Sequence, residues 1–483
     1  MVRLLSAALL ASATALFLKE KKTIDYFILK ESAGIEDAQA TVPDLWFENQ
    51  LLDHTDPSNK KTWKQRYHVN SQWFKGGNSP VFLYINGENV AHPTTVTTTS
   101  YFMSELAIKY GALVVSVEHR FYGQSQPTGD LNLESLKYLT MEQALADLAN
   151  FQKYYVSQNA NLTSANKWIT FGGSYPGMLS GFAMSKYPDI FAGSVASSAP
   201  IHTKTDFFEY SEKVAYGLKY FGGDACVNTI AQGFKDLHEL VAAEDTSKLN
   251  SLFNLCAPIK NDLDRMTVEL GIFGGFRDIA QFNGLQDYSL TDVCNDFAAG
   301  SGTPIEKLAN WTKVHIWDSS KCTGSDYKAE WLDYFSNTTV SDNIDRQWVY
   351  QTCAEFGFGQ TTAKSNSLFG VLKYGTVENV YYEVCKDIYN ITNTEDRAAA
   401  TRKTYGSLQI DVANVVWPTG TIDPWSALAL SNSSKPVNPR SEVVDIPGTA
   451  HCCDMFHSRY NFAPQWAHDR IEAAVVSYLH DKC

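Results

Sequence analysis

The most informative feature of the sequence is a motif of six consecutive residues, Gly-Gly-Ser-Tyr-Pro-Gly, at positions 172–177. The motif follows a short apolar run, Trp168–Phe171, and precedes small residues that can start a helix. A strand, a tight turn with a serine at its tip and a helix together form a nucleophile elbow. This turn exposes the serine oxygen and aims the next backbone N–H at the same point in space, so the motif predicts acyl-transfer chemistry at Ser174.

The motif departs from the usual Gly-x-Ser-x-Gly pattern because Pro176 replaces the last glycine. A proline in the first turn of a helix loses no hydrogen bond, because its missing N–H would have had no partner there. Pro176 also biases Tyr175 away from the helical region, so the sequence constrains the direction of the Tyr175 N–H less than the position of Ser174. For the motif alone, an ordinary strand-to-helix corner is the alternative.

Two further residues with triad chemistry follow Ser174 in the chain. In α/β-hydrolases the order is serine, then an acid, then histidine. Val415–Trp417 reads as a short buried strand and leads into a loop that contains Asp423, and Glu442–Ile446 leads into a loop that contains His451. Asp423 alone could be a turn residue and His451 a surface histidine. Their order and their position after strands predict a Ser174–Asp423–His451 triad.

Strand and helix patterns alternate in the first half of the chain. Buried strands are expected at 81–85, 113–117, 168–171 and 193–196, and a capping box at Thr140–Gln143 opens a helix. Apolar residues at helical spacing from Ile471 to Leu479 predict a closing helix. This alternation predicts a mostly parallel sheet.

The pattern changes between residues 205 and 395. Strand signals fade there, polar helical segments dominate, and six of the nine cysteines lie in this stretch. We therefore expect a hydrolase domain built from 40–204 and 396–483, with 205–395 as an insertion that carries disulfides. Nine is an odd number, so at least one cysteine has no intramolecular partner, and the connectivity stays open. There is no CxxC pair, and we expect neither a metal nor a cofactor.

The N-terminus resembles a secretory signal peptide, which we assign to residues 1–15, with an uncleaved anchor as the weaker alternative. The net charge of −13 and the pI near 5.3 argue against nucleic acid and anionic membranes as partners. A secreted, lysosomal or vacuolar protein is expected, and a homodimer is compatible with the sequence. Five glycosylation sequons fit this route: Asn161, Asn310, Asn337, Asn390 and Asn432.

Several longer stretches resemble one family, the S28 serine peptidases. That family includes lysosomal Pro-X carboxypeptidase, dipeptidyl peptidase II and thymus-specific serine protease. The residues of the matching stretches most resemble the thymus-specific serine protease branch. The resemblance covers most of the chain and implies an α/β-hydrolase fold with a large, mainly helical cap. The matching stretches are residues 46–54, 65–67, 118–123, 138–147, 194–200, 350–357, 423–425 and 451–454.

The resemblance implies an exopeptidase that cleaves after proline, either as a carboxypeptidase or as a dipeptidyl peptidase. A proline pocket should be flat and aromatic because the proline ring has no N–H to satisfy; Trp348, Tyr350 and Trp425 are candidates. Glu88 or Glu355 could bind the terminal amine of a peptide. An esterase or lipase on the same fold, and a non-catalytic binding protein, are the alternatives.

The remaining site residues are chosen from their positions. The oxyanion donors are expected to be the N–H groups of Tyr175 and of Gly87, which lies in the loop after the first strong strand. Glu118, His119 and Arg120 follow a buried strand, and we expect them to form a structural network of ion pairs and hydrogen bonds beneath the site. His457 is the rival of His451 but has no strand immediately before it.

Overall fold

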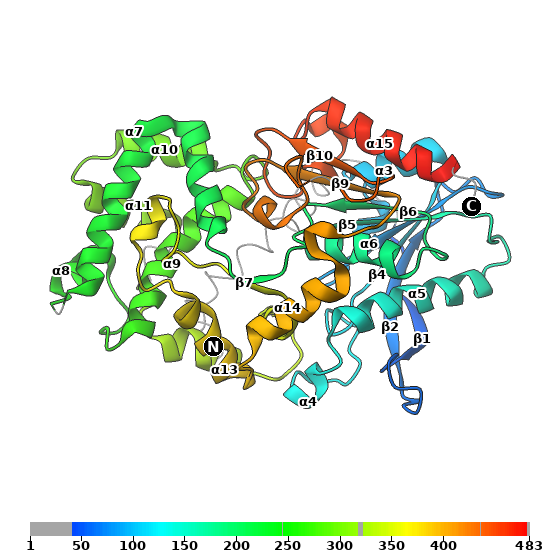
Figure 1. Ribbon diagram of the computed structural model, residues 1–483, viewed down its shortest axis with the longest axis horizontal. Helices are drawn as coiled ribbons and strands as arrows, with labels where there is room; N and C mark the ends of the chain where they lie inside the picture. The colour runs from blue at the N-terminus through cyan, green and yellow to red at the C-terminus, as the bar shows by residue number, and fades with distance from the viewer. Residues whose placement is uncertain (1–40, 244, 317–321, 435, 481–483) are drawn as a thin grey trace, which may run out of the picture. The chain divides into compact units, whose positions relative to one another are not determined.

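The computed structural model describes residues 41–243, 245–316, 322–434 and 436–480 (Figure 1). The signal peptide expected at residues 1–15 lies outside these ranges. Contacts divide the described chain into two compact units. One comprises residues 204–337 and 357–395, and the other comprises 41–203, 338–356 and 396–480. The segment 338–356, which falls inside the expected insertion 205–395, therefore groups with the sheet.

An eight-stranded sheet forms the centre of the second unit. Strand β2 is antiparallel to its neighbours β1 and β4, and the other pairs in the sheet are parallel. This is the α/β-hydrolase fold, as the sequence predicted. In spatial order the strands are β1 (Leu45–Leu51), β2 (Thr62–Asn70), β4 (Leu113–Val117), β3 (Val81–Ile85), β5 (Trp168–Gly173), β6 (Gly193–Ser197), β9 (Val415–Gly420) and β10 (Glu442–Ile446).

Helices cover both faces of this sheet (Figure 1). On one face, α3 (Phe102–Tyr110) and α15 (Gln465–His480) pack on an apolar cluster that includes Phe82, Val114 and Ile169. The expected residues Ile471 and Val475 of the closing helix belong to this cluster. On the other face lie α5 (Met141–Gln158) and α6 (Tyr175–Lys186). The unit also contains α2 (Thr94–Thr97), α4 (Leu133–Leu136) and α12 (Asp345–Gln351).

The start of α5 follows only half of the expected capping box. The Thr140 hydroxyl accepts from the Gln143 N–H at 3.2 Å. The Gln143 side chain does not accept from the Thr140 N–H, as a full capping box requires. It donates to Asp53 at 2.6 Å and accepts from the His54 N–H at 2.9 Å. Gln143 thus ties the helix start to the loop after β1.

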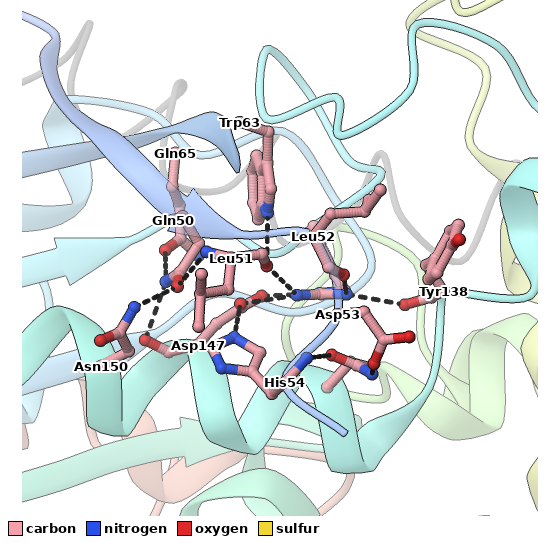
Figure 2. Close-up of polar contacts among 12 residues, drawn as sticks. Gln50, Leu51, Leu52, Asp53, His54, Trp63, Gln65, Tyr138, Asp147 and Asn150 are labelled. Carbon is pink, nitrogen blue, oxygen red and sulfur yellow. Dashed lines mark hydrogen bonds and ion pairs between the residues drawn. The ribbon is translucent and has the colours of Figure 1, made fainter. Parts of the chain in front are cut away.

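A buried ion-pair network supports the carboxyl end of β4, as expected for residues 118–120. Arg120 donates to both carboxylate oxygens of Asp147, at 2.6 Å each, and to the carbonyls of Leu51, Leu52 and Tyr138. Figure 2 labels these four partners. Glu118 is fully buried and accepts from Arg66. Removing one partner of such a pair would leave an uncompensated buried charge, so these residues are structural.

The other unit is mainly helical. Its α7 has a break at Gly223, where φ is +66°. The helices are α7 (Glu209–Ala242), α8 (Ser247–Phe253), α9 (Asp262–Gln281), α10 (Leu290–Ala299), α11 (Pro304–His315) and α13 (Glu383–Tyr389). A short parallel pair, β7 (Lys204–Asp206) and β8 (Gly357–Gly359), accompanies them. Helix α14 (Thr394–Tyr405) belongs mostly to the unit with the sheet, from residue 396 on.

The six cysteines between 226 and 385 are all disulfide-bonded. The bridge Cys226–Cys294 joins α7 to α10, and Cys256 pairs with Cys322. Cys452 and Cys453 are buried free thiols. Across the described ranges, the helices are all too short or too polar to cross a bilayer.

Candidate active site

Ser174 lies at the tip of a strained turn between β5 and α6. Its backbone has φ +63° and ψ −129°, a conformation that is costly for a residue with a side chain. The glycines around it allow the turn: a Cβ on Gly172 would lie 2.2 Å from the Pro176 carbonyl oxygen, and one on Gly177 would lie 2.6 Å from the Ser197 carbonyl oxygen. Ser174 is half-buried, whereas Tyr175 is fully buried. The geometry is that of a nucleophile elbow.

Asp423 and His451 form a buried pair. The Nδ1 atom of His451 lies 2.8 Å from Oδ2 of Asp423, and both side chains are at most 1 % exposed. A carboxylate only accepts, so Nδ1 carries the proton, which leaves Nε2 as the basic nitrogen of the neutral ring. Burial opposes the charge on His451, but the carboxylate of Asp423 outweighs it, and the pKa of His451 lies well above its ordinary value.

The loops that carry Ser174 and His451 lie side by side. A Cβ on Gly173 would be 2.9 Å from the Cys452 sulfur and 2.1 Å from the Met455 sulfur. The residue before Ser174 therefore touches the residue after His451. A Cβ on Gly420 would lie 2.6 Å from the Ala450 carbonyl, so the strand before Asp423 also touches the His451 loop. The structure thus gathers all three segments at the carboxyl ends of β5, β9 and β10.

Gly87 packs directly against the elbow. A Cβ at this position would lie 2.3 Å from Cγ of Pro176 and 3.4 Å from the Tyr175 ring. The ring of Pro176 therefore fills the space that a side chain at position 87 would need. Gly87 and Tyr175 are neighbours, which two oxyanion donors must be.

The side chain of Tyr175 is anchored beneath the elbow. His119 Nδ1 lies 2.7 Å from the Arg120 carbonyl, which can only accept, so in the neutral ring His119 Nε2 accepts from the Tyr175 hydroxyl at 2.9 Å. Gln351 donates to the same hydroxyl at 3.0 Å. Burial raises the pKa of Tyr175 well above its ordinary value, so the phenol stays protonated. The bond of His119 belongs to the hydrogen-bond network expected for residues 118–120. The sequence did not predict this role for Gln351, although it lies in a stretch that matched the family.

Two of the expected aromatic residues lie beside these elements. The partly exposed Trp348 ring lies 5.7 Å from the Tyr175 ring, and Phe356 lies 5.2 Å from it. The Trp425 ring lies 6.3 Å from the His451 ring. Tyr350 instead packs against a separate apolar cluster with Leu131, Leu136 and Leu139. Trp348 and Trp425 are therefore better placed than Tyr350 to meet a substrate.

The two candidate acids differ in their surroundings. Both carboxylate oxygens of Glu355 accept from the Met141 N–H at the start of α5, at 3.1 and 2.9 Å. Burial raises the pKa of Glu355 to about 8, so it is neutral at acidic pH and a poor partner for an ammonium group. Glu88 is partly exposed and close enough for its charge to act on Tyr175. The geometry favours Glu88 over Glu355 as an amine ligand.

His457 occupies a different environment from His451. Its Nδ1 lies 3.1 Å from Glu105 of α3 and accepts from the Arg459 N–H. The carboxylate of Asp423, the acid expected in the triad, bonds to His451 and not to His457. The asparagines of the five sequons are all exposed. Within the described part of the chain, histidine, cysteine and acidic side chains do not gather in groups of three or more that could hold a metal ion.

Comparisons with known proteins agree on one family. A family model described as Serine carboxypeptidase S28 matches residues 50–470. A putative serine protease of Caenorhabditis elegans is 33% identical over 454 residues, 89% of this chain and 87% of its own length. The thymus-specific serine protease of Mus musculus is 32% identical over 93% of this chain and 90% of its own length. Lysosomal Pro-X carboxypeptidase of Mus musculus is 25% identical over 94% of this chain and 92% of its own length.

Proposed function

The chain belongs to the serine carboxypeptidase S28 family and is a serine-type peptidase, and from that premise we propose that it hydrolyses peptide bonds with Ser174, Asp423 and His451 through an acyl-enzyme. The observation that carries the proposal is the buried hydrogen bond between His451 and Asp423, at 2.8 Å, beside the strained turn of Ser174. This arrangement supplies a base whose tautomer is fixed, on a loop beside the one that carries the half-buried Ser174.

In this mechanism His451 accepts the proton of Ser174 as the oxygen attacks the peptide carbonyl, and then donates that proton to the leaving amine. Asp423 holds the Nδ1–H and stabilises the imidazolium that forms. Water then attacks the ester, again with His451 as the base, and the acid product leaves.

The Tyr175 and Gly87 N–H groups bind the oxyanion in this proposal. Support comes from the contact of Gly87 with Pro176 and from the anchored Tyr175 side chain. Losing one such donor typically costs about 3 kcal/mol of transition-state stabilisation.

The enzyme is proposed to be an exopeptidase that prefers proline before the cleaved bond. The partly exposed ring of Trp348 offers an apolar face next to Tyr175, and the mostly buried ring of Trp425 lies beside His451. A proline ring suits such faces because it presents no N–H. The name of one relative, lysosomal Pro-X carboxypeptidase, agrees with this preference. A free carboxyl end or a free amino end of the substrate is a second recognition element, and the experiment below distinguishes the two.

A secreted or lysosomal location fits the molecule. Six bonded cysteines require an oxidising compartment during folding, and relatives are named lysosomal and extracellular. The exposed asparagines at 161, 310, 337, 390 and 432 are proposed to carry glycans, which a mass shift on glycosidase treatment would reveal.

Covalent labelling tests the nucleophile. A fluorophosphonate probe is expected to label the wild-type enzyme and not Ser174→Ala. Equal labelling of the two proteins would end the proposal of Ser174.

A peptide panel tests specificity. Peptides of the type X-Pro-Y, with free or blocked ends, are compared with their X-Ala-Y counterparts and with simple esters at acidic and neutral pH. Faster cleavage after proline, with one free end required, supports the proposal. Cleavage of esters alone would favour an esterase instead, and no cleavage of any proline peptide would remove the specificity claim.

A further inference from the structure

Ser197 and Ser198, at the carboxyl end of β6, contact the segments that carry all three proposed triad residues. The Ser174 N–H donates to the Ser197 carbonyl at 2.9 Å. The Ser198 N–H donates at 2.7 Å to the carbonyl of Pro418, on the strand that leads to Asp423. The Ser198 hydroxyl accepts from the Cys452 N–H at 3.0 Å, next to His451.

Of these three hydrogen bonds, two join backbone groups, and only the bond from Cys452 uses a side chain, the Ser198 hydroxyl. Ser198 is 1 % exposed and Cys452 is 2 % exposed, so water does not easily replace the bond. Both residues have positive φ, +46° at Ser198 and +58° at Cys452, which is costly for residues with side chains. The hydrogen bond thus connects two strained backbones.

The His451 loop has a second anchor on the other side. The Ile422 N–H donates to the Thr449 carbonyl at 3.2 Å, which ties this loop to the Asp423 side. Ser198 ties it to the nucleophile side. A further bond, from the Ser197 hydroxyl to Asp454 at 2.5 Å, holds the residues that follow. These contacts hold the loop of His451 on both sides.

We propose that Ser198 is a positioning residue for the triad: its hydroxyl holds the Cys452 N–H and thereby sets the imidazole of His451 at the distance from Ser174 that proton transfer needs. The inference rests on the proposed function. Ser198 itself touches none of the residues proposed to bind the substrate in the contacts described above, so its removal should slow chemistry without weakening substrate binding.

The test compares Ser198→Ala and Ser198→Gly with a matched control, Ser180→Ala. Ser180 is also a buried serine, and its hydroxyl bonds to Thr170 and Ser194, away from the three loops. Glycine at 198 removes the hydroxyl but relieves the positive φ, so it separates positioning from folding stability. For each variant we measure kcat and KM on the best peptide, the rate of fluorophosphonate labelling, and Tm.

Both Ser198 variants are expected to lose about tenfold in kcat and in labelling rate, with KM within about twofold, while Ser180→Ala keeps its kcat. The loss in Ser198→Gly should appear even where its Tm is not lowered. An unchanged kcat in Ser198→Gly, or equal losses in Ser180→Ala, would overturn the inference. A wild-type enzyme that fails to label at Ser174 would instead mean that the proposed function is wrong.

Discussion

The carboxylate of Asp423 accepts a hydrogen bond from the Nδ1–H of His451 at 2.8 Å, and both side chains are at most 1% exposed. An asparagine at 423 could present its NH₂ group to Nδ1 and favour the tautomer that carries its proton on Nε2. That nitrogen would then be unable to take the proton of Ser174.

Asp423→Asn is therefore expected to lower kcat by about 10⁴-fold with little change in KM, as such a tautomer change does in a related triad. The pKa that governs the acidic limb of kcat/KM should also fall, because the carboxylate that raises the pKa of His451 is gone. Steady-state kinetics across pH on one peptide measures both effects. A loss below tenfold would argue against a triad role for Asp423.

Glu355 gives the protein a pH-dependent stability. Its folded pKa of about 8 lies above the ordinary value of 4.5, so the folded state holds a proton that the unfolded state releases in this range. Stability then falls as pH rises from about 4.5 to about 8, by roughly 1.4 kcal/mol per pH unit from this group.

Glutamine mimics the protonated acid and does not titrate. Glu355→Gln should thus gain stability relative to wild type as pH rises through that window, and the two proteins should converge at pH 4. Denaturant unfolding of both proteins at pH 4, 6 and 8 measures the difference. Parallel curves would contradict the assignment.

At the scale of elements, the loop after β3 packs tightly against the N-terminus of α6. A Cβ on Gly87 would lie 2.3 Å from the ring of Pro176, which is itself fixed in the first turn of the helix. Either the loop or the elbow must move to admit it.

Gly87→Ala should cost about 1–3 kcal/mol of unfolding free energy and lower kcat more than KM, because the displaced groups are the proposed oxyanion donors. Ala91, in the same loop and buried, offers a matched position: Ala91→Gly also changes one methyl group but does not touch the elbow contacts given above. Unfolding curves and steady-state kinetics compare the two variants. If both variants have equal kcat, Gly87 is not part of the site.

The parallel strands could be predicted, but the first two strands could not. Strands β3, β4, β5, β6, β9 and β10 are short apolar runs with turn signals around them, which periodicity detects. Strand β2 buries Gln65, Arg66 and His68. The side chains of Gln65 and Arg66 both bond to Glu118, which is 52 residues away from Arg66. Nothing in the local pattern reveals those partners.

The candidate site divides in the same way. Ser174, Asp423 and His451 could be proposed because their order and their position after strands have a chemical meaning. The Ser198 hydroxyl and the Gln351 amide could not, since each acts through one contact with a residue far away in the chain. Only the stretch around each, which matched the family, pointed to them.

At the scale of the whole sheet, strand order explains why the loops that carry the three proposed residues lie at one edge. Strands β5, β6, β9 and β10 are consecutive neighbours and run parallel, so the loops at their carboxyl ends share one edge. Ser174 follows β5, Asp423 follows β9 and His451 follows β10. The strand between the first two, β6, ends in the serine pair that contacts all three segments.

The most direct test of this convergence is to map the fluorophosphonate adduct by mass spectrometry in the wild-type enzyme and in His451→Gln. We predict a single adduct on Ser174 in the wild type, and a labelling rate at least about a thousandfold lower in the variant. An adduct on another serine, or a labelling rate that does not depend on His451, would contradict the account.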